Sequence, residues 1–99
     1  RRVQCRGRLH DTTLDWEDEL PEPDFSKSIH HSEKSTLSLT LGTSLQINPA
    51  GLQPLETLDN PDGKLVIVNL QRTPHHDEAT MTIHAKVDGV MSGLLRELG

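Results

Sequence analysis

Residues 64–70 read KLVIVNL, and this run decides the fold class. Its aliphatic and β-branched side chains follow one another without polar alternation, which predicts a strand buried on both faces. Strands of this kind belong to parallel sheets that helices cover. The turn sequence DNPDG at 59–63 precedes the run and ends the preceding element. We therefore expect KLVIVNL inside an α/β sheet.

Upstream of this run, LSLTL at 37–41 alternates leucine with small polar residues and predicts a strand buried mostly on one face. Asp24 is expected to N-cap a helix over 25–35, because Phe25 and Ile29 then share one face with Ser32. Pro54, Leu55 and Leu58 indicate a short helix before the turn. Residues 8–15 suit an exposed strand or extended loop, and Pro21 and Pro23 follow.

Downstream, a polar loop over 71–80 leads to TMTIH at 80–84, which has the alternation of a short edge strand. The segment 87–98 predicts a helix with one apolar stripe. Strands and helices thus alternate along the chain, which predicts a piece of a doubly wound parallel sheet.

Composition limits the possible functions. With 99 residues, 32% of them hydrophobic, the chain has material for one small core. A net charge of -5 argues against strong direct nucleic-acid binding, since the only basic cluster is Arg1, Arg2, Arg6 and Arg8. No apolar stretch approaches the ~18 residues of a membrane span, so a soluble, intracellular protein without a membrane partner is expected. The chain opens without Met, which suggests part of a longer protein.

Polar residues follow the first two expected strands, where ligands bind in open parallel sheets. Gly42, Thr43 and Ser44 follow LSLTL: the glycine admits a ligand to the backbone, and the hydroxyls can hold ribose or phosphate oxygens. Asn69 and Gln71 follow LVIV, and a carboxamide there can bond ribose hydroxyls. Plain turns, with Ser44 as a cap or Asn69 closing a loop, explain these residues equally well.

Complete nucleotide or metal sites are not encoded. Neither GxGxxG nor GxxxxGK[ST] occurs, so the chain can supply only half of a nucleotide site. Cys5 is the only cysteine, whereas a structural zinc site needs four ligands.

The histidines are interpreted as structural. His30 with His31, and His75 with His76, are adjacent pairs among polar residues, which favours surface positions. Packing is the favoured role of His84.

An acidic segment surrounds the only tryptophan. Asp15, Trp16 and Glu17 belong to it, and Asp18 and Glu19 continue the charge. Such a segment is usually a solvated loop, although an exposed tryptophan beside a strand can cover an extended peptide.

Taken together and in order, the segments at 5–21 (CRGRLHDTTLDWEDELP), 39–51 (LTLGTSLQINPAG), 64–74 (KLVIVNLQRTP) and 83–91 (IHAKVDGVM) resemble the sirtuin family of NAD-dependent protein deacylases, nearest to the nuclear sirtuin-six type. The resemblance implies an α/β fold: the C-terminal half of a Rossmann-like parallel sheet with flanking helices, plus the tail of a small zinc-binding module. Residues 1–20 would end the zinc module and form the substrate-peptide loop, and residues 21–99 would belong to the NAD-binding domain.

The resemblance also implies residue roles. Gly42, Thr43 and Ser44 would lie at the nicotinamide-ribose and phosphate side of NAD. Asn69 and Gln71 would contact the adenosine ribose. Val87 would line the adenine, and Cys5 would be the fourth ligand of a structural zinc ion. The acyl-lysine peptide would pair with Asp15, Trp16 and Glu17. Within that segment, Trp16 would form a wall of the acyl-lysine tunnel.

By the same resemblance, the partners would be NAD and acyl-lysine proteins such as histones, and the location would be the nucleus. Two departures stand out: His84-Ala85 replaces the usual His-Gly, and an acidic LDNPDG replaces a basic loop. The family's Gly-Ala-Gly phosphate loop, Gln-Asn-x-Asp motif and catalytic histidine do not occur here. We therefore expect the parent protein to be a deacylase, with possible ADP-ribosyl transfer, and this chain alone to be inactive.

Two other readings remain open at this point. A truncated, inactive sirtuin would act as an interaction module or competitor. A nucleotide-binding regulatory domain of another α/β family would bind NAD or ATP without recognising acyl-lysine.

Overall fold

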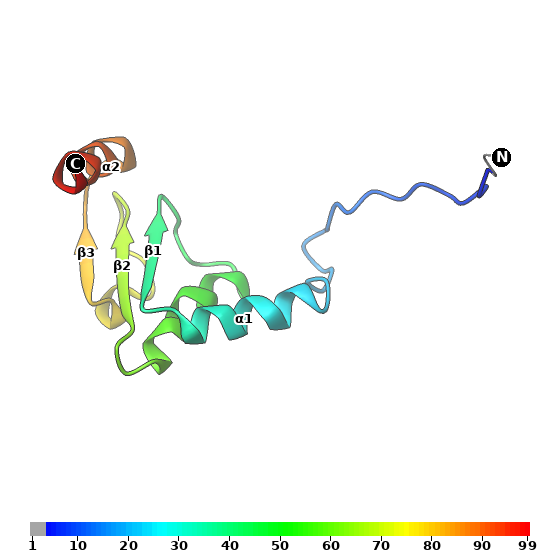
Figure 1. The fold of residues 1–99 in the computed structure, drawn as a ribbon, viewed down its shortest axis with the longest axis horizontal. Helices are drawn as coiled ribbons and strands as arrows, with labels where there is room; N and C mark the ends of the chain where they lie inside the picture. Colours follow the sequence, from blue (N-terminus) through cyan, green and yellow to red (C-terminus); the bar gives the residue numbers. More distant parts are fainter. Residues whose placement is uncertain (1–3) are drawn as a thin grey trace.

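The computed structural model describes residues 4–99, so Arg1 and Arg2 of the basic cluster lie outside the described residues. Within that range the chain alternates helices and strands (Figure 1). The elements are α1 (Asp24–Lys34), β1 (Leu37–Leu41), the 3-10 helix η1 (Ala50–Asp59), β2 (Lys64–Val68), the short 3-10 helix η2 (His76–Glu78), β3 (Met81–Ile83) and α2 (Val87–Leu98).

The strands of residues 4–99 form one parallel sheet in the order β1-β2-β3. Thr40 pairs with Ile67, and Ile67 pairs with Thr82 on the other side. The central position of β2 and the edge position of β3 confirm the predictions from the sequence. All strands point the same way, so their carboxyl ends meet at one edge of the sheet.

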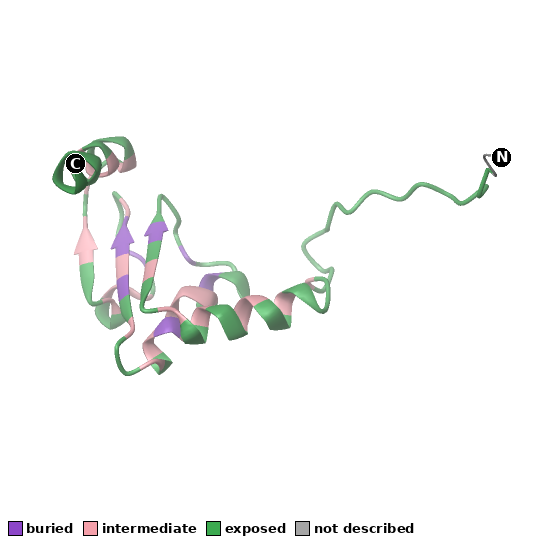
Figure 2. Ribbon diagram, viewed as in Figure 1, coloured by how far each residue is buried: buried purple, intermediate pink, exposed green. Residues whose placement is uncertain are grey.

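The core lies on one face of this sheet. Leu65 and Ile67 of β2 are buried there and pack with Leu45, while Leu55 and Leu58 of η1 cover them. Thr40 of β1 is also buried, which matches its pairing with Ile67. The helices α1 and η1 run beneath this face and pack against each other (Figures 1 and 2).

Burial on both faces, expected for β2, is only partly correct. On the second face Val68 is buried but Val66 is only half-buried. In β1 the leucines point to this second face, and Leu37 and Leu39 are exposed. The one buried face of β1 is therefore its Ser38 and Thr40 side, because small side chains let η1 approach the sheet closely.

The start of α1 also differs from expectation. Asp24 is the first helical residue, and Pro23 occupies the N-cap position. The carboxylate of Glu22 accepts hydrogen bonds from the backbone N–H of Ser26 at 3.2 Å and from its hydroxyl at 2.9 Å. Glu22 thus satisfies a free N–H group of the first turn, the task predicted for Asp24. Phe25, Ile29 and Ser32 share the half-buried face, as predicted.

Two glycines permit the tight packing of η1. A Cβ on Gly63 would lie 1.8 Å from the carbonyl oxygen of Thr57, and a Cβ on Gly51 would lie 2.6 Å from that of Leu45. Both distances are far below van der Waals contact, so only glycine fits. Gly63 belongs to the turn that leads into β2, and its N–H donates to the carbonyl of Asn60 at 2.8 Å.

Residues 4–19 are exposed and form an extended loop that runs away from the sheet (Figures 1 and 2). Residues 8–15 form no strand here. Of the two predictions for this segment, an exposed strand or an extended loop, the extended loop is correct. Among the helices of the described residues, none has the length and apolarity needed to cross a membrane.

Candidate functional site at the carboxyl edge of the sheet

The loops that leave the three described strands meet at the carboxyl edge of the sheet and surround a hollow of about 410 Å³. Gly42 follows β1, Asn69 follows β2, and Val87 begins α2 after β3. All three residues line this hollow. Residues separated by 45 positions in the sequence, from Gly42 to Val87, therefore share one cavity.

Gly42 closes the end of β1 in a backbone conformation that favours glycine. Its φ is +64°, and its N–H donates to the carbonyl of Val68 at 2.9 Å. A Cβ at this position would lie 3.6 Å from Cγ2 of Val87, which is ordinary contact. Glycine is thus required by the dihedral angle and not by lack of space. Its bare Cα leaves the backbone open to a ligand.

Asn69 is held at the end of β2 by both backbone and side chain. Its N–H donates to the carbonyl of Ile83, 3.1 Å away, and its side-chain amide donates to the carbonyl of Gln71 at 2.9 Å. The side chain therefore closes the local turn, as the alternative reading expected. Asn69 is half-buried and its side-chain carbonyl remains an acceptor, whereas Gln71 is exposed and does not line the hollow.

Thr43 and Ser44 line a neighbouring hollow of about 400 Å³, bounded on its far side by η1. The hydroxyl of Thr43 accepts the N–H of Leu45 at 3.3 Å, and Leu45 has a φ of +53°. Ser44 does not cap a helix, because η1 begins at Ala50 with Pro49 as its N-cap. The cap interpretation of Ser44 is therefore wrong, and the exposed Ser44 side chain is available to a ligand.

In the loop between β3 and α2, the family resemblance indicated Val87 and the His84-Ala85 departure, but it did not indicate Lys86 or Asp88. Ala85, Lys86 and Asp88 line the same hollow as Gly42 and Asn69. Within the described chain no side chain caps the N-terminus of α2, so its first N–H groups are open to solvent or ligand. The rule that directed attention to the ends of the first two strands applies equally to β3 and would have found these residues.

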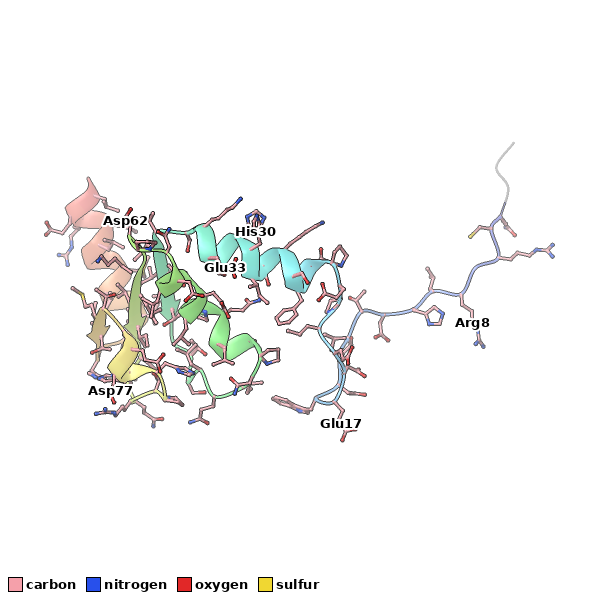
Figure 3. All side chains as sticks on the ribbon, turned by 90° about the horizontal axis from the view of Figure 1, so that it is seen from below. Arg8, Glu17, His30, Glu33, Asp62 and Asp77 are labelled. Atoms are coloured by element: carbon pink, nitrogen blue, oxygen red, sulfur yellow. The ribbon has the colours of Figure 1, made fainter. Side chains whose placement is uncertain are left out.

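The segment around Trp16 forms a turn beside the start of α1. The N–H of Asp18 donates to the carbonyl of Asp15, and the N–H of Asp15 donates to the Asp18 carboxylate at 2.8 Å. Trp16 is 84% exposed and borders a hollow with Phe25. Glu17 points outward (Figure 3) and, like Asp15, does not line it. The three residues are thus available to a partner but are not near the sheet edge (Figure 1).

The histidine pairs behave differently from each other. His30 and His31 are exposed on α1, as predicted, and His30 points away from the sheet (Figure 3). His75 and His76 are half-buried, so a surface position for this pair is wrong. The ring of His76 stacks on that of His84, with ring centroids 4.9 Å apart, which supports the packing role of His84. His84 itself is exposed, so this stack lies at the surface of the molecule.

Cys5 alone does not fit a metal. It is exposed in the extended loop, and its sulfur lies 3.5 Å from the N–H of Gly7. One thiolate cannot replace the four ligands of a structural zinc ion, so this chain does not complete the zinc site implied by the resemblance. Over residues 4–99, the side chains grouped closely enough to share an ion are Glu33, Glu56 and Asp59, which lie on α1 and η1.

A parallel sheet with flanking helices, a glycine at the end of one strand and a hollow across the carboxyl edge give this chain the architecture of an open α/β sheet, a class in which ligands bind at that edge. Comparison with known proteins is more specific. A curated NAD-dependent protein deacetylase of Arabidopsis thaliana, SRT1, is 47% identical over 95 residues, which is 96% of this chain and 20% of the relative. The Drosophila melanogaster deacetylase Sirt6 is 46% identical over 96 residues, 96% of this chain and 30% of the relative.

A solved structure agrees with these relatives. A Sir2 protein in complex with a p53 peptide and NAD+ superimposes with a TM-score of 0.76 at 36% identity, covering 82% of this chain and 33% of that protein. No family model matches the chain. Over nearly its whole length, this chain is homologous to the NAD-dependent protein deacetylases of the sirtuin family. It spans about a fifth to a third of the length of these proteins.

Proposed function

We propose that this chain supplies one side of the NAD site of an NAD-dependent protein-lysine deacylase, together with a loop that binds the substrate peptide. The observation that carries the proposal is the shared hollow of about 410 Å³ between Gly42, Asn69 and Val87. The homologous deacetylases depend on NAD by name, and a Sir2 relative was solved with NAD+ and a peptide.

In this proposal each part of the edge has a task that suits its chemistry. The side-chain carbonyl of Asn69 can accept a hydrogen bond from a ribose hydroxyl. This oxygen faces the ligand because the side-chain amide N–H already donates to the backbone carbonyl of Gln71. Val87 supplies an apolar wall for the adenine. Thr43 and Ser44 offer hydroxyls and free backbone groups to the nicotinamide-ribose and phosphate side. Gln71 would contact the same adenosine ribose as Asn69 after its exposed side chain turns inward.

Bound NAD would supply the electrophilic sugar carbon and the nicotinamide leaving group. The residues of this chain would bind and orient its ribose groups and transfer no proton. The general base and the phosphate loop would come from chain beyond the matched stretch, because their motifs do not occur in this sequence.

The remaining roles are part of the same proposal. Asp15, Trp16 and Glu17 would contact the acyl-lysine peptide, and Trp16 has the exposure that such a contact needs. Cys5 would be the fourth ligand of a structural zinc whose other ligands come from elsewhere. Histones, and therefore a nuclear location, are the proposed setting, in keeping with an acidic segment that suits basic peptide tails.

A chimera tests the proposal. This chain replaces the 96 matched residues of the Drosophila deacetylase, and deacetylation of an acetyl-lysine histone peptide is measured against NAD concentration. We expect turnover by the chimera and none by the isolated chain, which lacks a general base. Val87→Trp, which fills the hollow, should raise the KM for NAD at least tenfold.

The matched control is Leu98→Trp at the exposed end of the same helix, which should leave the KM for NAD unchanged. A folded chimera without turnover would contradict the proposed function. Equal effects of the two tryptophan substitutions would contradict the assignment of the hollow as the NAD site. Binding of ATP as tight as that of NAD would favour a regulatory nucleotide domain instead.

A further inference from the structure

The 3-10 helix η1 carries two parallel rows of side chains. In a 3-10 helix, residues three positions apart lie directly above one another. Leu52, Leu55 and Leu58 therefore form an apolar row. Glu56 and Asp59 form an acidic row beside it by the same spacing. Both rows border a groove of about 340 Å³, here called the η1 groove, to which η2 also contributes.

The apolar row is only partly covered by the rest of the described chain. Leu55 and Leu58 pack against the core and also line the groove. Leu52 is 41% exposed. The volume of the groove lies at the small end of the range for ligand pockets, roughly 300–1,000 Å³. Such a groove fits one or two apolar side chains better than it fits a cofactor.

The rim of the η1 groove is acidic, and its lining residues include neither lysine nor arginine. Glu78 of η2 adds a third carboxylate to those of Glu56 and Asp59. Glu33 of α1 lies close by (Figure 3), since its carboxylate and those of Glu56 and Asp59 fall within 4.8 Å of one another. Among residues 4–99, none of Glu33, Glu56 and Asp59 forms an ion pair. The rim therefore attracts cationic groups and repels nucleic acids and anionic membranes.

The η1 groove lies at the opposite edge of the sheet from the candidate NAD hollow. The helix η1 runs into β2 through the turn at 60–63, and η2 leads into β3. The groove therefore lies near the amino ends of these strands (Figure 1), whereas Gly42 and Asn69 follow carboxyl ends. A partner held in the groove would leave the hollow open to a nucleotide.

We propose that the η1 groove docks a basic amphipathic helix of a separate protein. One or two apolar side chains of this helix lie on the leucine row, and its lysine or arginine side chains lie along the acidic row. A bound cation alone would leave the leucines exposed to water. A second copy of this chain is disfavoured, because each copy has a net charge of -5. The inference goes beyond the proposed function, since the docked helix touches no part of the NAD hollow.

Peptide binding tests the inference. The probe is a fluorescent synthetic peptide of about 14 residues, roughly four helical turns, with leucines on one face and lysines beside them. Fluorescence anisotropy measures its Kd for the unchanged chain. We expect a Kd on the order of 10 µM, which should rise with added salt because screening weakens exposed ion pairs. The same peptide with serine in place of leucine should bind roughly tenfold more weakly.

Substitutions in the chain separate the groove from the net charge. Leu52→Asn should weaken peptide binding roughly tenfold, because it removes apolar contact area. Glu56→Gln should weaken it roughly threefold, the size expected for one exposed ion pair. The matched controls are Leu95→Asn and Glu97→Gln on α2, whose side chains are exposed and lie outside the groove. Both controls should leave the Kd unchanged, and thermal melting shows that each variant is folded.

The chimera described under the proposed function is titrated in parallel. We expect it to bind the peptide as tightly as the isolated chain does, with or without saturating NAD. Weaker binding by the chimera would show that the rest of the enzyme occupies the groove, and displacement by NAD would place the peptide in the hollow. Either result would contradict the docking site.

Three further outcomes would overturn the inference: no binding of the leucine-lysine peptide, equal binding of the serine peptide, or equal losses for the groove variants and their α2 controls. These outcomes are separable from the test of the proposed function. An inactive chimera that binds the peptide keeps the docking site and contradicts the function. An active chimera that does not bind the peptide contradicts the docking site alone.

Discussion

The hydroxyl oxygens of Thr57 and Ser35 lie 2.8 Å apart and join η1 to the end of α1. Both hydroxyls also approach the carbonyl of Ser32, at 3.1 Å from Thr57 and 2.8 Å from Ser35. The side chain of Thr57 is fully buried. This polar contact fixes the helix pair that supports β2, and through β2 it supports the strand end that carries Asn69.

Thr57→Val keeps the volume of the side chain but removes its hydroxyl. We expect the free energy of unfolding to fall by about 1–2 kcal/mol, because a buried hydrogen-bonded network loses one member. Urea denaturation of the isolated chain measures this. Thr36→Val is the control, since Thr36 is exposed and should change stability by less than about 0.5 kcal/mol. Equal stability of the two variants would show that the Thr57 hydroxyl is not important.

Two glycine substitutions should have opposite effects on stability. Gly63→Ala places a Cβ 1.8 Å from the Thr57 carbonyl and should cost on the order of 2 kcal/mol or more. Gly89→Ala, in α2, meets nothing within 4 Å and should add about 0.5–1 kcal/mol through helix propensity. Differential scanning calorimetry should show the melting temperature falling for the first and rising for the second. A rise for both would mean that the turn before β2 relaxes freely.

Asn69→Ala and Ser44→Ala should differ kinetically in the deacetylase chimera. Asn69 is expected to bind the adenosine ribose, far from the bond that breaks, so its removal should raise the KM for NAD and leave kcat within a few fold. The expected cost is roughly 1–3 kcal/mol, or about five- to a hundred-fold in kcat/KM. Ser44→Ala should also lower kcat, because its contacts change as charge develops at the nicotinamide ribose.

Steady-state kinetics with NAD varied at saturating peptide separates these two cases. A lower kcat with unchanged KM for Asn69→Ala would refute the ribose role. A pure KM effect for Ser44→Ala would place that residue away from the reacting sugar.

Zinc should not bind stoichiometrically to the isolated chain. Cys5 supplies one thiolate, and the remaining clustered candidates on α1 and η1 are carboxylates, which are poor substitutes in a structural zinc site. Elemental analysis after gel filtration should therefore find far less than one zinc per chain. Cys5→Ser should leave the melting temperature of the isolated chain unchanged. One zinc per chain that disappears in Cys5→Ser would contradict this.

The strands and helices could be predicted closely from the sequence because their signals are local. The predicted strand over 37–41 and helix over 87–98 match β1 and α2 residue for residue. Strand β2 ends at Val68, two residues before the predicted end, because Asn69 turns its side chain back to Gln71. The 3-10 geometry of η1 was not predictable, since the positions of Leu55 and Leu58 suit an α-helix and a 3-10 helix alike.

The candidate site was only partly predictable. Strand ends indicated Gly42 and Asn69, because a parallel sheet brings carboxyl ends together. Val87 came from the family resemblance. Its neighbours Lys86 and Asp88 were missed because the strand-end rule was applied only to the first two strands and not to β3. The half-buried position of His75 could not be predicted either, since it depends on how the chain after β2 folds back.

The position of α2 has an entropic consequence for the candidate site. The helix carries Val87 at the rim of the hollow that Asn69 also lines, and no residue of this helix is fully buried. In the proposed site, a nucleotide that packs against Val87 would restrict the motion of this helix. Part of the binding free energy would then offset the conformational entropy that the helix loses, so a substitution that orders the helix in the free chain should tighten nucleotide binding.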